Sequence, residues 1–249
     1  MPNTLSALNG IVDGVRQILL AFIAAGAHDI LVPNLPDVGQ VPLVFSQDPL
    51  PGQPAGSKLV ATTATALTTL YNTALRSMLE EAEFAGVNII PFDTFSFLRD
   101  VVAHPAAFGL TNVTQGCYTG FVQPAGPNDT VCSTPDTYLF WDGEHPTTVA
   151  HGHLAVLMLD GIRLATLNDF RTQVGELGIP HGIQSALQGK IDDAIAVLLD
   201  NDPGNDGDAI DIVGAFINQV EAQRGKKIPE AAADELIRRA QQVIELLRA

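Results

Sequence analysis

Two side chains near the middle of the chain have the types and the spacing for proton-transfer chemistry. Asp142 precedes His145 by three residues in the segment Trp141-Asp142-Gly143-Glu144-His145-Pro146-Thr147. A carboxylate at this spacing can accept the N–H of one imidazole nitrogen, so that the other nitrogen can take a proton from a hydroxyl. We therefore identify Asp142 as the candidate orienting carboxylate and His145 as the candidate general base.

An Asp-x-x-His pair also occurs by chance, and a surface ion pair is its usual explanation. Three neighbouring features favour the catalytic interpretation. The apolar run Tyr138-Leu139-Phe140-Trp141 is expected to be extended and to lead into the pair. Gly143 is expected to allow a sharp turn, and Pro146-Thr147 is expected to fix the entry into the next helix.

The nucleophile that such a base would serve is not evident from the sequence. Ser46, Ser96 and Ser133 are the candidates, and none has a persuasive setting. The scattered glycines form no phosphate-binding fingerprint, so we expect no nucleotide cofactor.

Metal binding is weighed at two places. His151 and His153 point in different directions on a helix, so they cannot share an ion with His145, and we expect no metal there. Residues 200–208 have the composition of a calcium loop, but Val213 stands where an EF-hand needs a bidentate Glu. An acidic connection between two helices is the simpler explanation, and calcium binding stays open.

Elements that could position the pair alternate along the first part of the chain. We expect helices at residues 4–25, 57–85, 94–103 and 146–164, and strands at 29–33, 87–93 and 138–141, with a long loop at 104–137. Strands made of apolar runs between helices indicate a parallel α/β architecture. Two or three strands are too few for such a sheet, which suggests that its first strands are missing.

The texture of the sequence becomes entirely helical after about residue 165. Helices are expected at 167–177, 180–199, 207–224 and 229–248. We therefore predict two domains: an incomplete α/β domain over residues 1–165 and an all-α helical bundle over 166–249.

Composition limits the partners and the compartment. The net charge of −15 leaves no basic face for nucleic acid or anionic lipid. The apolar run at residues 18–27 is about half the length that spans a bilayer. Cys117 and Cys132 lie in a loop rich in Gly, Pro, Asn and Thr, and a disulfide between them would favour an extracellular or periplasmic protein. Two unpaired thiols are the alternative.

The segment 138–147 resembles the last sequence block of SGNH (GDSL-type) lipases and esterases, in the branch of secreted phospholipases, lecithinases and hemolysin-like proteins. Residues 32–39 resemble the loop after a strand in that family, and 104–113, followed by the two cysteines, resemble its pre-catalytic loop. The resemblance covers about residues 1–165. The tail around residues 216–228 resembles small FIMAH-like helical modules of secreted bacterial proteins.

This resemblance implies a flavodoxin-like three-layer α/β fold and a serine hydrolase that cleaves carboxylic esters, with His145 as the base and Asp142 orienting it. The family takes its nucleophile from a Gly-Asp-Ser motif, and its oxyanion donors are the backbone N–H of that Ser, a Gly, and the Asn of a Gly-x-Asn-Asp motif. Neither motif occurs in this sequence. Asn128-Asp129 follows the strands instead of preceding them and lacks the glycine two residues earlier.

Two hypotheses follow for the chain. In the first, it is the C-terminal portion of a secreted hydrolase of small-molecule or lipid esters, truncated before the nucleophile, inactive in isolation, and with its export signal upstream of Met1. In the second, it is a non-catalytic extracellular binding or adaptor protein that uses the α/β remnant as a scaffold. A third possibility is that a separate chain supplies the missing strands. The remnant would then expose the edge and face of its sheet, and we expect poor solubility or self-association when it is expressed alone.

Overall fold

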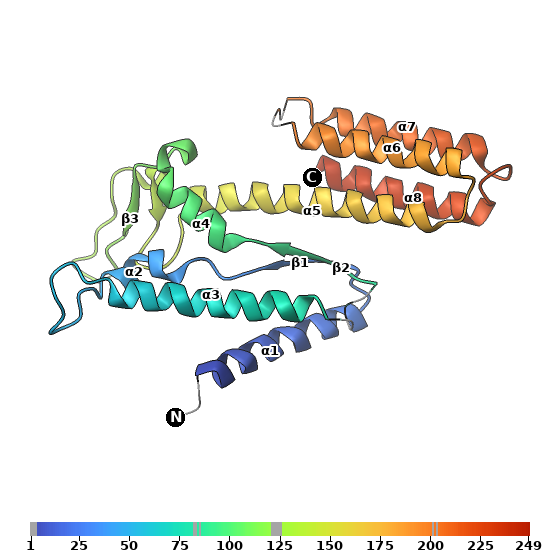
Figure 1. Ribbon diagram of the computed structural model, residues 1–249. Coiled ribbons are helices and arrows are strands. Elements are labelled where there is room, and N and C mark those ends of the chain that lie inside the picture. Colours follow the sequence, from blue (N-terminus) through green and yellow to red (C-terminus); the bar gives the residue numbers. More distant parts are fainter. Residues whose placement is uncertain (1–3, 82–83, 85, 121–125, 201, 203) are drawn as a thin grey trace. The chain divides into compact units, whose positions relative to one another are not determined.

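The computed structural model describes residues 4–81, 84, 86–120, 126–200, 202 and 204–249. The chain divides into two compact units, Met1–Met158 and Leu159–Ala249. The described part of the first unit combines helices with four short strands, whereas that of the second is helical (Figure 1). The first unit therefore has the α/β character that the sequence predicts.

The elements of the first unit follow one another as α1 (Thr4–Ala24), β1 (Asp29–Pro33), η1 (Val38–Gln40), α2 (Pro42–Phe45), α3 (Leu59–Leu79), β2 (Asn88–Phe92), α4 (Thr94–Ala103), η3 (Pro105–Phe108), β3 (Asn112–Gly116), η4 (Pro135–Thr137), β4 (Tyr138–Phe140) and the start of α5 (Thr148–Glu176). The three η elements are single turns of 3-10 helix.

The strands form two parallel pairs. β1 pairs with β2 in a regular register that runs from Asp29 opposite Asn88 to Pro33 opposite Phe92. β3 pairs with β4, with Asn112 opposite Tyr138 and an irregularity in the register between Asn112 and Gly116. The sequence did not predict β3, because its residues Asn-Val-Thr-Gln-Gly are mostly polar and its exposed positions show no apolar run.

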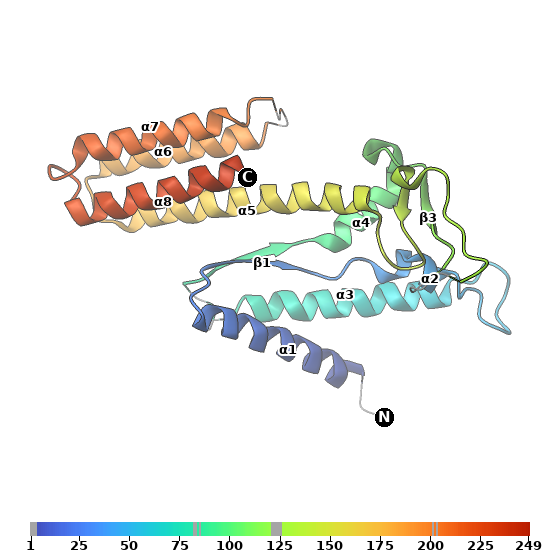
Figure 2. The same ribbon diagram turned by 180° about the vertical axis from the view of Figure 1, so that it is seen from behind.

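Helices α1 and α3 run side by side in both views and form an apolar core with β1 (Figures 1 and 2). The buried side of α3 carries Tyr71, Leu75 and Met78. From its helical spacing, the sequence of α3 predicts an apolar stripe of Leu67, Leu70, Ala74 and Met78. Met78 is buried, but Leu67 and Leu70 are 39% and 47% exposed. Two stripes with helical spacing overlap on α3, and packing against α1 and β1 selects the one with the tyrosine.

Helix α1 buries only a narrow stripe. Val12 and Leu19 are buried, whereas Ile11 and Ile18 are each 56% exposed and Phe22 is 52% exposed. The segment Ser6–Ala24 is long and apolar enough to cross a membrane by length and composition, a property that a signal sequence or a core helix can share. The sequence predicted no such span, because the uninterrupted apolar run covers only residues 18–27.

A second core in the first unit lies under the candidate site. Its buried members come from α4, β4, the first turn of α5 and the connecting segments, and they are Val41, Leu98, Val101, Leu110, Leu139, Phe140 and Ala150. Leu139 and Phe140 are 2% and 1% exposed, so the end of β4 is anchored by apolar packing immediately before Asp142.

The second unit contains the rest of α5 together with α6 (His181–Leu198), α7 (Asp208–Gln223) and α8 (Glu230–Arg248) around one apolar core. We expected a helix ending near Leu164 and another at 167–177, but α5 is continuous from Thr148 to Glu176. No Gly or Pro interrupts residues 162–174, and Leu167, Phe170 and Val174 are fully buried at helical spacing. The predicted domain boundary therefore falls inside a helix.

Candidate active site

The carboxylate of Asp142 lies at the end of β4 in an almost closed setting. Its side chain is 5% exposed. The backbone N–H groups of Glu144 and His145 both donate to Asp142 Oδ1, each at 2.8 Å. These two hydrogen bonds fold residues 142–145 into a tight turn and fix the orientation of the carboxylate.

The imidazole of His145 meets this carboxylate through Nδ1, which lies 2.9 Å from Oδ2 and 3.1 Å from Oδ1 of Asp142. The His145 side chain is 62% exposed. The structure therefore brings together the two residues that the sequence pairs. The buried carboxylate of Asp142 contacts one nitrogen of the imidazole, and solvent reaches the ring. A proton held on Nδ1 leaves Nε2 as the basic nitrogen of the neutral ring.

The protonation equilibria of the pair are coupled by this contact. Burial raises the pKa of Asp142, but the backbone hydrogen bonds from His145 and Glu144 and the contact with the imidazole outweigh it, so its pKa lies below the usual value. The pKa of His145 is raised, first by its hydrogen bond to Asp142 and then by the negative charges of Asp142 and Glu144. Both shifts favour a charged pair at mildly acidic pH.

Hydrogen bonds on either side hold the turn in place. The Trp141 N–H donates to the His145 carbonyl at 2.7 Å, and the Leu43 N–H donates to the Gly143 carbonyl at 2.7 Å. Gly143 is not among the glycines with positive φ, and a Cβ on it would meet Leu43 Cβ at an ordinary 3.5 Å. The turn therefore does not require a glycine at position 143, contrary to the expectation from the sequence. The geometry of the turn comes from the hydrogen bonds to Asp142.

The exit from the turn is fixed by Thr147 as much as by the preceding proline. The Thr147 hydroxyl donates to the Tyr138 carbonyl at 2.7 Å and accepts the Ala150 N–H at 3.3 Å. A threonine hydroxyl that accepts the N–H of the residue three positions later is an N-cap, so Thr147 caps the start of α5. The sequence placed the helix start at Pro146, but Thr148 is its first helical residue.

A disulfide joins Cys117 to Cys132, as one of the two sequence interpretations predicts. The Cys132 N–H donates to the Cys117 carbonyl, and Tyr118 forms an isolated antiparallel β-bridge with Val131. The Tyr118 ring stacks on Trp141 at 5.8 Å between centroids, next to Asp142. Sequence reasoning missed this contact, because nothing in the separate segments indicates that they are neighbours. Residues 121–125 of the expected loop lie outside the described part of the chain.

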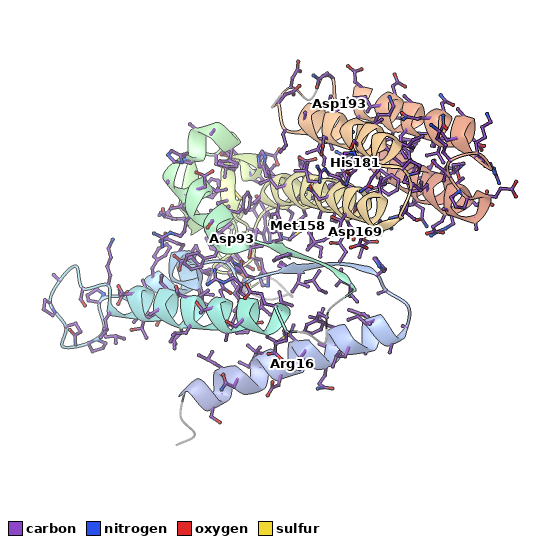
Figure 3. All side chains as sticks on the ribbon, turned by 45° about the vertical axis from the view of Figure 1, so that its right-hand side comes forward. Arg16, Asp93, Met158, Asp169, His181 and Asp193 are labelled. Carbon is purple, nitrogen blue, oxygen red and sulfur yellow. A yellow bond between two sulfur atoms is a disulfide. The ribbon has the colours of Figure 1, made fainter. Side chains whose placement is uncertain are left out.

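Two of the three candidate serines have hydroxyl groups that serve the local structure. Ser46 Oγ donates to the Leu43 carbonyl at 3.0 Å. Ser96 Oγ donates to Asp93 Oδ2 at 2.6 Å, where β2 leads into α4 (Figure 3). Asp93 also accepts the Ser96 N–H, so this is a helix cap and not an activated nucleophile.

Of the other candidate ligands, His153 and Asp200 form hydrogen bonds within the fold. His153 lies against Phe108 through a hydrogen bond from its Nε2 to the Phe108 carbonyl at 3.0 Å, and His151 is exposed. Among the described residues, no group of three side chains able to hold a metal includes either histidine or His145. Asp200 accepts hydrogen bonds from Asp202 N and from Asn205 Nδ2 within its own loop, of which residues 201 and 203 are not described.

A surface pocket of about 500 Å³ adjoins the turn. It is lined by Pro42, Leu43, Phe45, Ser46, Thr114, Gln115, Gly116 and Gly143. The pocket thus joins α2, the end of β3 and the turn at residues 142–145, which sequence reasoning did not bring together.

Comparisons with known proteins show which family the first part of the chain resembles. Residues 3–158 match the family model described as GDSL-like lipase/acylhydrolase. The chain is 28% identical over 153 residues to the Arabidopsis thaliana protein GDSL esterase/lipase At4g16230, a match that covers 59% of this chain and 40% of that protein. It is 28% identical to GDSL esterase/lipase APG (60% and 43% covered) and 32% identical to GDSL esterase/lipase EXL2 (54% and 36% covered), both of the same plant. The chain thus spans about two fifths of the length of these relatives.

Proposed function

The chain belongs to the GDSL-like lipase/acylhydrolase family, and from this we propose that Asp142 and His145 are the orienting carboxylate and general base of a carboxylic ester hydrolase. The nucleophilic serine and the oxyanion donors would come from polypeptide outside this sequence. The substrate would be a small-molecule or lipid ester, as the names of the relatives suggest.

One observation carries this proposal: a buried carboxylate, itself held by two backbone N–H groups, contacts Nδ1 of an imidazole that solvent reaches. An ordinary surface ion pair does not bury its carboxylate or direct two backbone donors at it. The hydrogen bonds from the His145 and Glu144 N–H groups and the contact with the imidazole lower the pKa of Asp142 in spite of its burial and keep it charged, and the charge holds the Nδ1–H tautomer that general-base catalysis needs.

The chemistry follows from this arrangement. The Nε2 atom of His145 would accept the serine proton as Oγ attacks the ester carbonyl carbon. It would then protonate the leaving alcohol oxygen when the tetrahedral intermediate collapses to an acyl-enzyme. In the second half-reaction water attacks the acyl carbon while His145 takes its proton. The bond between the acyl carbon and Oγ then breaks, His145 returns the proton to Oγ, and the carboxylic acid leaves. Asp142 stabilises the imidazolium that forms in each half.

The 249-residue chain tests where the nucleophile lies. We expect no turnover of p-nitrophenyl acetate or butyrate above buffer, and no labelling by a fluorophosphonate probe that reacts with activated serines. Labelling of Ser46, Ser96 or Ser133 that disappears in His145→Ala would show that the nucleophile is in this sequence and would contradict the proposal on that point.

The role of the pair itself is tested in a chimera. The part of GDSL esterase/lipase At4g16230 that precedes its matched region is fused ahead of residue 3, and ester hydrolysis is measured. We expect His145→Ala to abolish turnover and Asp142→Asn to lower kcat by about 10⁴. His151→Ala, an exposed position on α5, is the matched control and leaves the rate unchanged. Equal rates in all three variants would refute the assignment.

Two further proposals concern the whole protein. The Cys117–Cys132 disulfide supports an extracellular or periplasmic location. The separate apolar core of Leu159–Ala249 supports an independent helical module after the hydrolase portion. Secretion with a reporter fused to the natural reading frame tests the location, and an exclusively cytoplasmic reporter would contradict it.

A further inference from the structure

The last residue of β3 lies in direct contact with the backbone of Asp142. A Cβ built on Gly116 would stand 2.6 Å from both the carbonyl carbon and the oxygen of Asp142, and 2.8 Å from its Cα. Real Cβ atoms do not approach backbone so closely, so a side chain at position 116 requires one of the two segments to move. Gly116 is not among the glycines with positive φ. A glycine is therefore needed at this position because there is no space for a side chain, and not because of the backbone conformation.

The segment that carries Gly116 has little freedom to move. Gly116 is opposite Phe140 in the β3–β4 ladder, and the next residue, Cys117, donates its N–H to the Phe140 carbonyl at 3.1 Å. Tyr118 donates its N–H to the Trp141 carbonyl. The disulfide of Cys117 adds a covalent anchor immediately after the strand. Phe140 is 1% exposed, so β4 cannot retreat into its core without disturbing it.

The Asp142 turn is the part that can yield. It is held by hydrogen bonds within residues 141–145 and by the Leu43 N–H, with no covalent link of its own. A displacement of a few tenths of an ångström changes the contacts of Asp142 with Nδ1 of His145, which now measure 2.9 and 3.1 Å. Hydrogen bonds weaken when their length or angle is changed in this way.

We propose that Gly116 is a positioning residue: its missing side chain lets the backbone of Asp142 seat against the end of β3, and this seat aims the carboxylate at His145. The proposal rests on the proposed function for its catalytic meaning, but the seat itself is a structural property. It is therefore measurable in the chain without any ester turnover.

The test is a pH titration of the six histidine rings by NMR in the full chain, with His145 assigned from the spectrum of His145→Ala. Asp142 and Glu144 are the charged groups that raise the pKa of His145, and Tyr118 lies against Asp142. In Gly116→Ala we expect the pKa of His145 to move from its raised value toward that of an ordinary histidine. Asp142→Asn marks the full extent of that change.

The matched control is Gly14→Ala. Gly14 lies in α1 of the same unit, and a Cβ there meets no atom within 4 Å. This variant should leave the His145 titration unchanged. As a second readout, the Glu144 and His145 amides, which donate to Asp142, should exchange with solvent at least several-fold faster in Gly116→Ala, while amides of α3 keep their protection.

Two results overturn the inference. One is a folded Gly116→Ala chain with the wild-type His145 titration and wild-type amide exchange at residues 144 and 145. The other is loss of α3 protection together with the site, because Gly116 would then serve the whole unit and not the position of Asp142. If the chimera shows that His145 is dispensable for hydrolysis while Gly116→Ala still shifts its titration, the proposed function fails and this inference stands.

Discussion

At the scale of single residues, the decisive feature is that Asp142 contacts two backbone N–H groups in addition to the imidazole of His145. The spacing of Asp142 and His145 predicts that the two side chains meet. The sequence does not show that the N–H groups of Glu144 and His145 are directed at the same oxygen, because backbone donors carry no residue-type signal. These donors keep the buried carboxylate ionised, and an ionised carboxylate is what raises the pKa of the imidazole.

Asp142→Asn should lower the pKa of His145 and weaken the fold in a limited pH window. The raised pKa of His145 contributes stability that is present below the unfolded value of about 6.5 and is lost as pH rises through the folded pKa. The lowered pKa of Asp142 contributes stability that is present above about 3.9 and is lost as pH falls through its folded pKa. The variant should therefore lose more stability at pH 5.5 than at pH 9.

Urea unfolding followed by the fluorescence of Trp141, the only tryptophan in the chain, measures this difference in the first unit. Asp100→Asn is the control, because Asp100 forms an exposed i,i+4 pair with His104 on the surface. We expect little effect from the control at either pH. Equal destabilisation by Asp142→Asn at pH 5.5 and pH 9 would show that the charge of the pair does not matter.

At the scale of elements, the sequence predicts most helices, but on α3 it does not predict which face is buried. On α3 the apolar residues allow a stripe through Leu67 and Leu70 or one through Tyr71 and Leu75, and only the neighbouring α1 and β1 decide between them. The polar strand β3 was missed for a related reason: its place is fixed by its pairing with β4, not by its own composition. The local hydrophobic pattern predicts that a helix forms, whereas the tertiary contacts of that helix determine which of its faces is buried.

Gly39→Ala should destabilise the first unit through the contact between η1 and α3. A Cβ at Gly39 would lie 2.2 Å from Thr65 Oγ1 and 2.3 Å from the Ala61 carbonyl oxygen, and the latter is helix backbone that cannot rotate away. Overpacking of this kind costs about 1–3 kcal/mol. Thr65 also donates to Asp37, whose side chain is fully buried, so the clash disturbs a buried hydrogen bond as well.

Urea unfolding with the Trp141 signal again provides the measurement, and Gly10→Ala is the control. Gly10 lies in α1, and a Cβ at this position would meet no atom within 4 Å, so alanine there should stabilise by about 0.5–1 kcal/mol through helix propensity. A Gly39→Ala chain as stable as wild type would mean that η1 shifts away from α3 at no cost.

At the scale of the whole molecule, the change in composition near residue 165 predicts a helical module that includes the last part of α5. Leu167, Phe170 and Val174 of α5 are fully buried in the core of the second unit. A fragment of residues 159–249 should therefore melt cooperatively by circular dichroism. A fragment of 178–249 should not, because it loses these three side chains at about 2–5 kcal/mol each. Equal cooperativity of the two fragments would place the module boundary after α5.

The exposed apolar side of α1 leads to a prediction about association. Ile11, Ile18 and Phe22 are each more than half exposed on one helix, and neighbouring Leu67 and Leu70 of α3 are partly exposed. The net charge of −15 opposes association, but it is spread over the chain, whereas these five apolar side chains lie on two neighbouring helices. We expect the sedimentation coefficient of the isolated chain to rise with concentration at moderate salt.

The triple variant Ile11→Gln, Ile18→Gln, Phe22→Gln should sediment as a monomer and keep the wild-type Trp141 melt, because none of the three side chains belongs to the core around Val12 and Leu19. The control is Val156→Gln with Leu157→Gln, which removes apolar side chains that are 60% and 42% exposed on α5. If association needs the apolar side of α1, the control associates like wild type. A wild-type chain that stays monomeric at all concentrations contradicts the prediction, since about half of each of these large side chains would then face water without consequence.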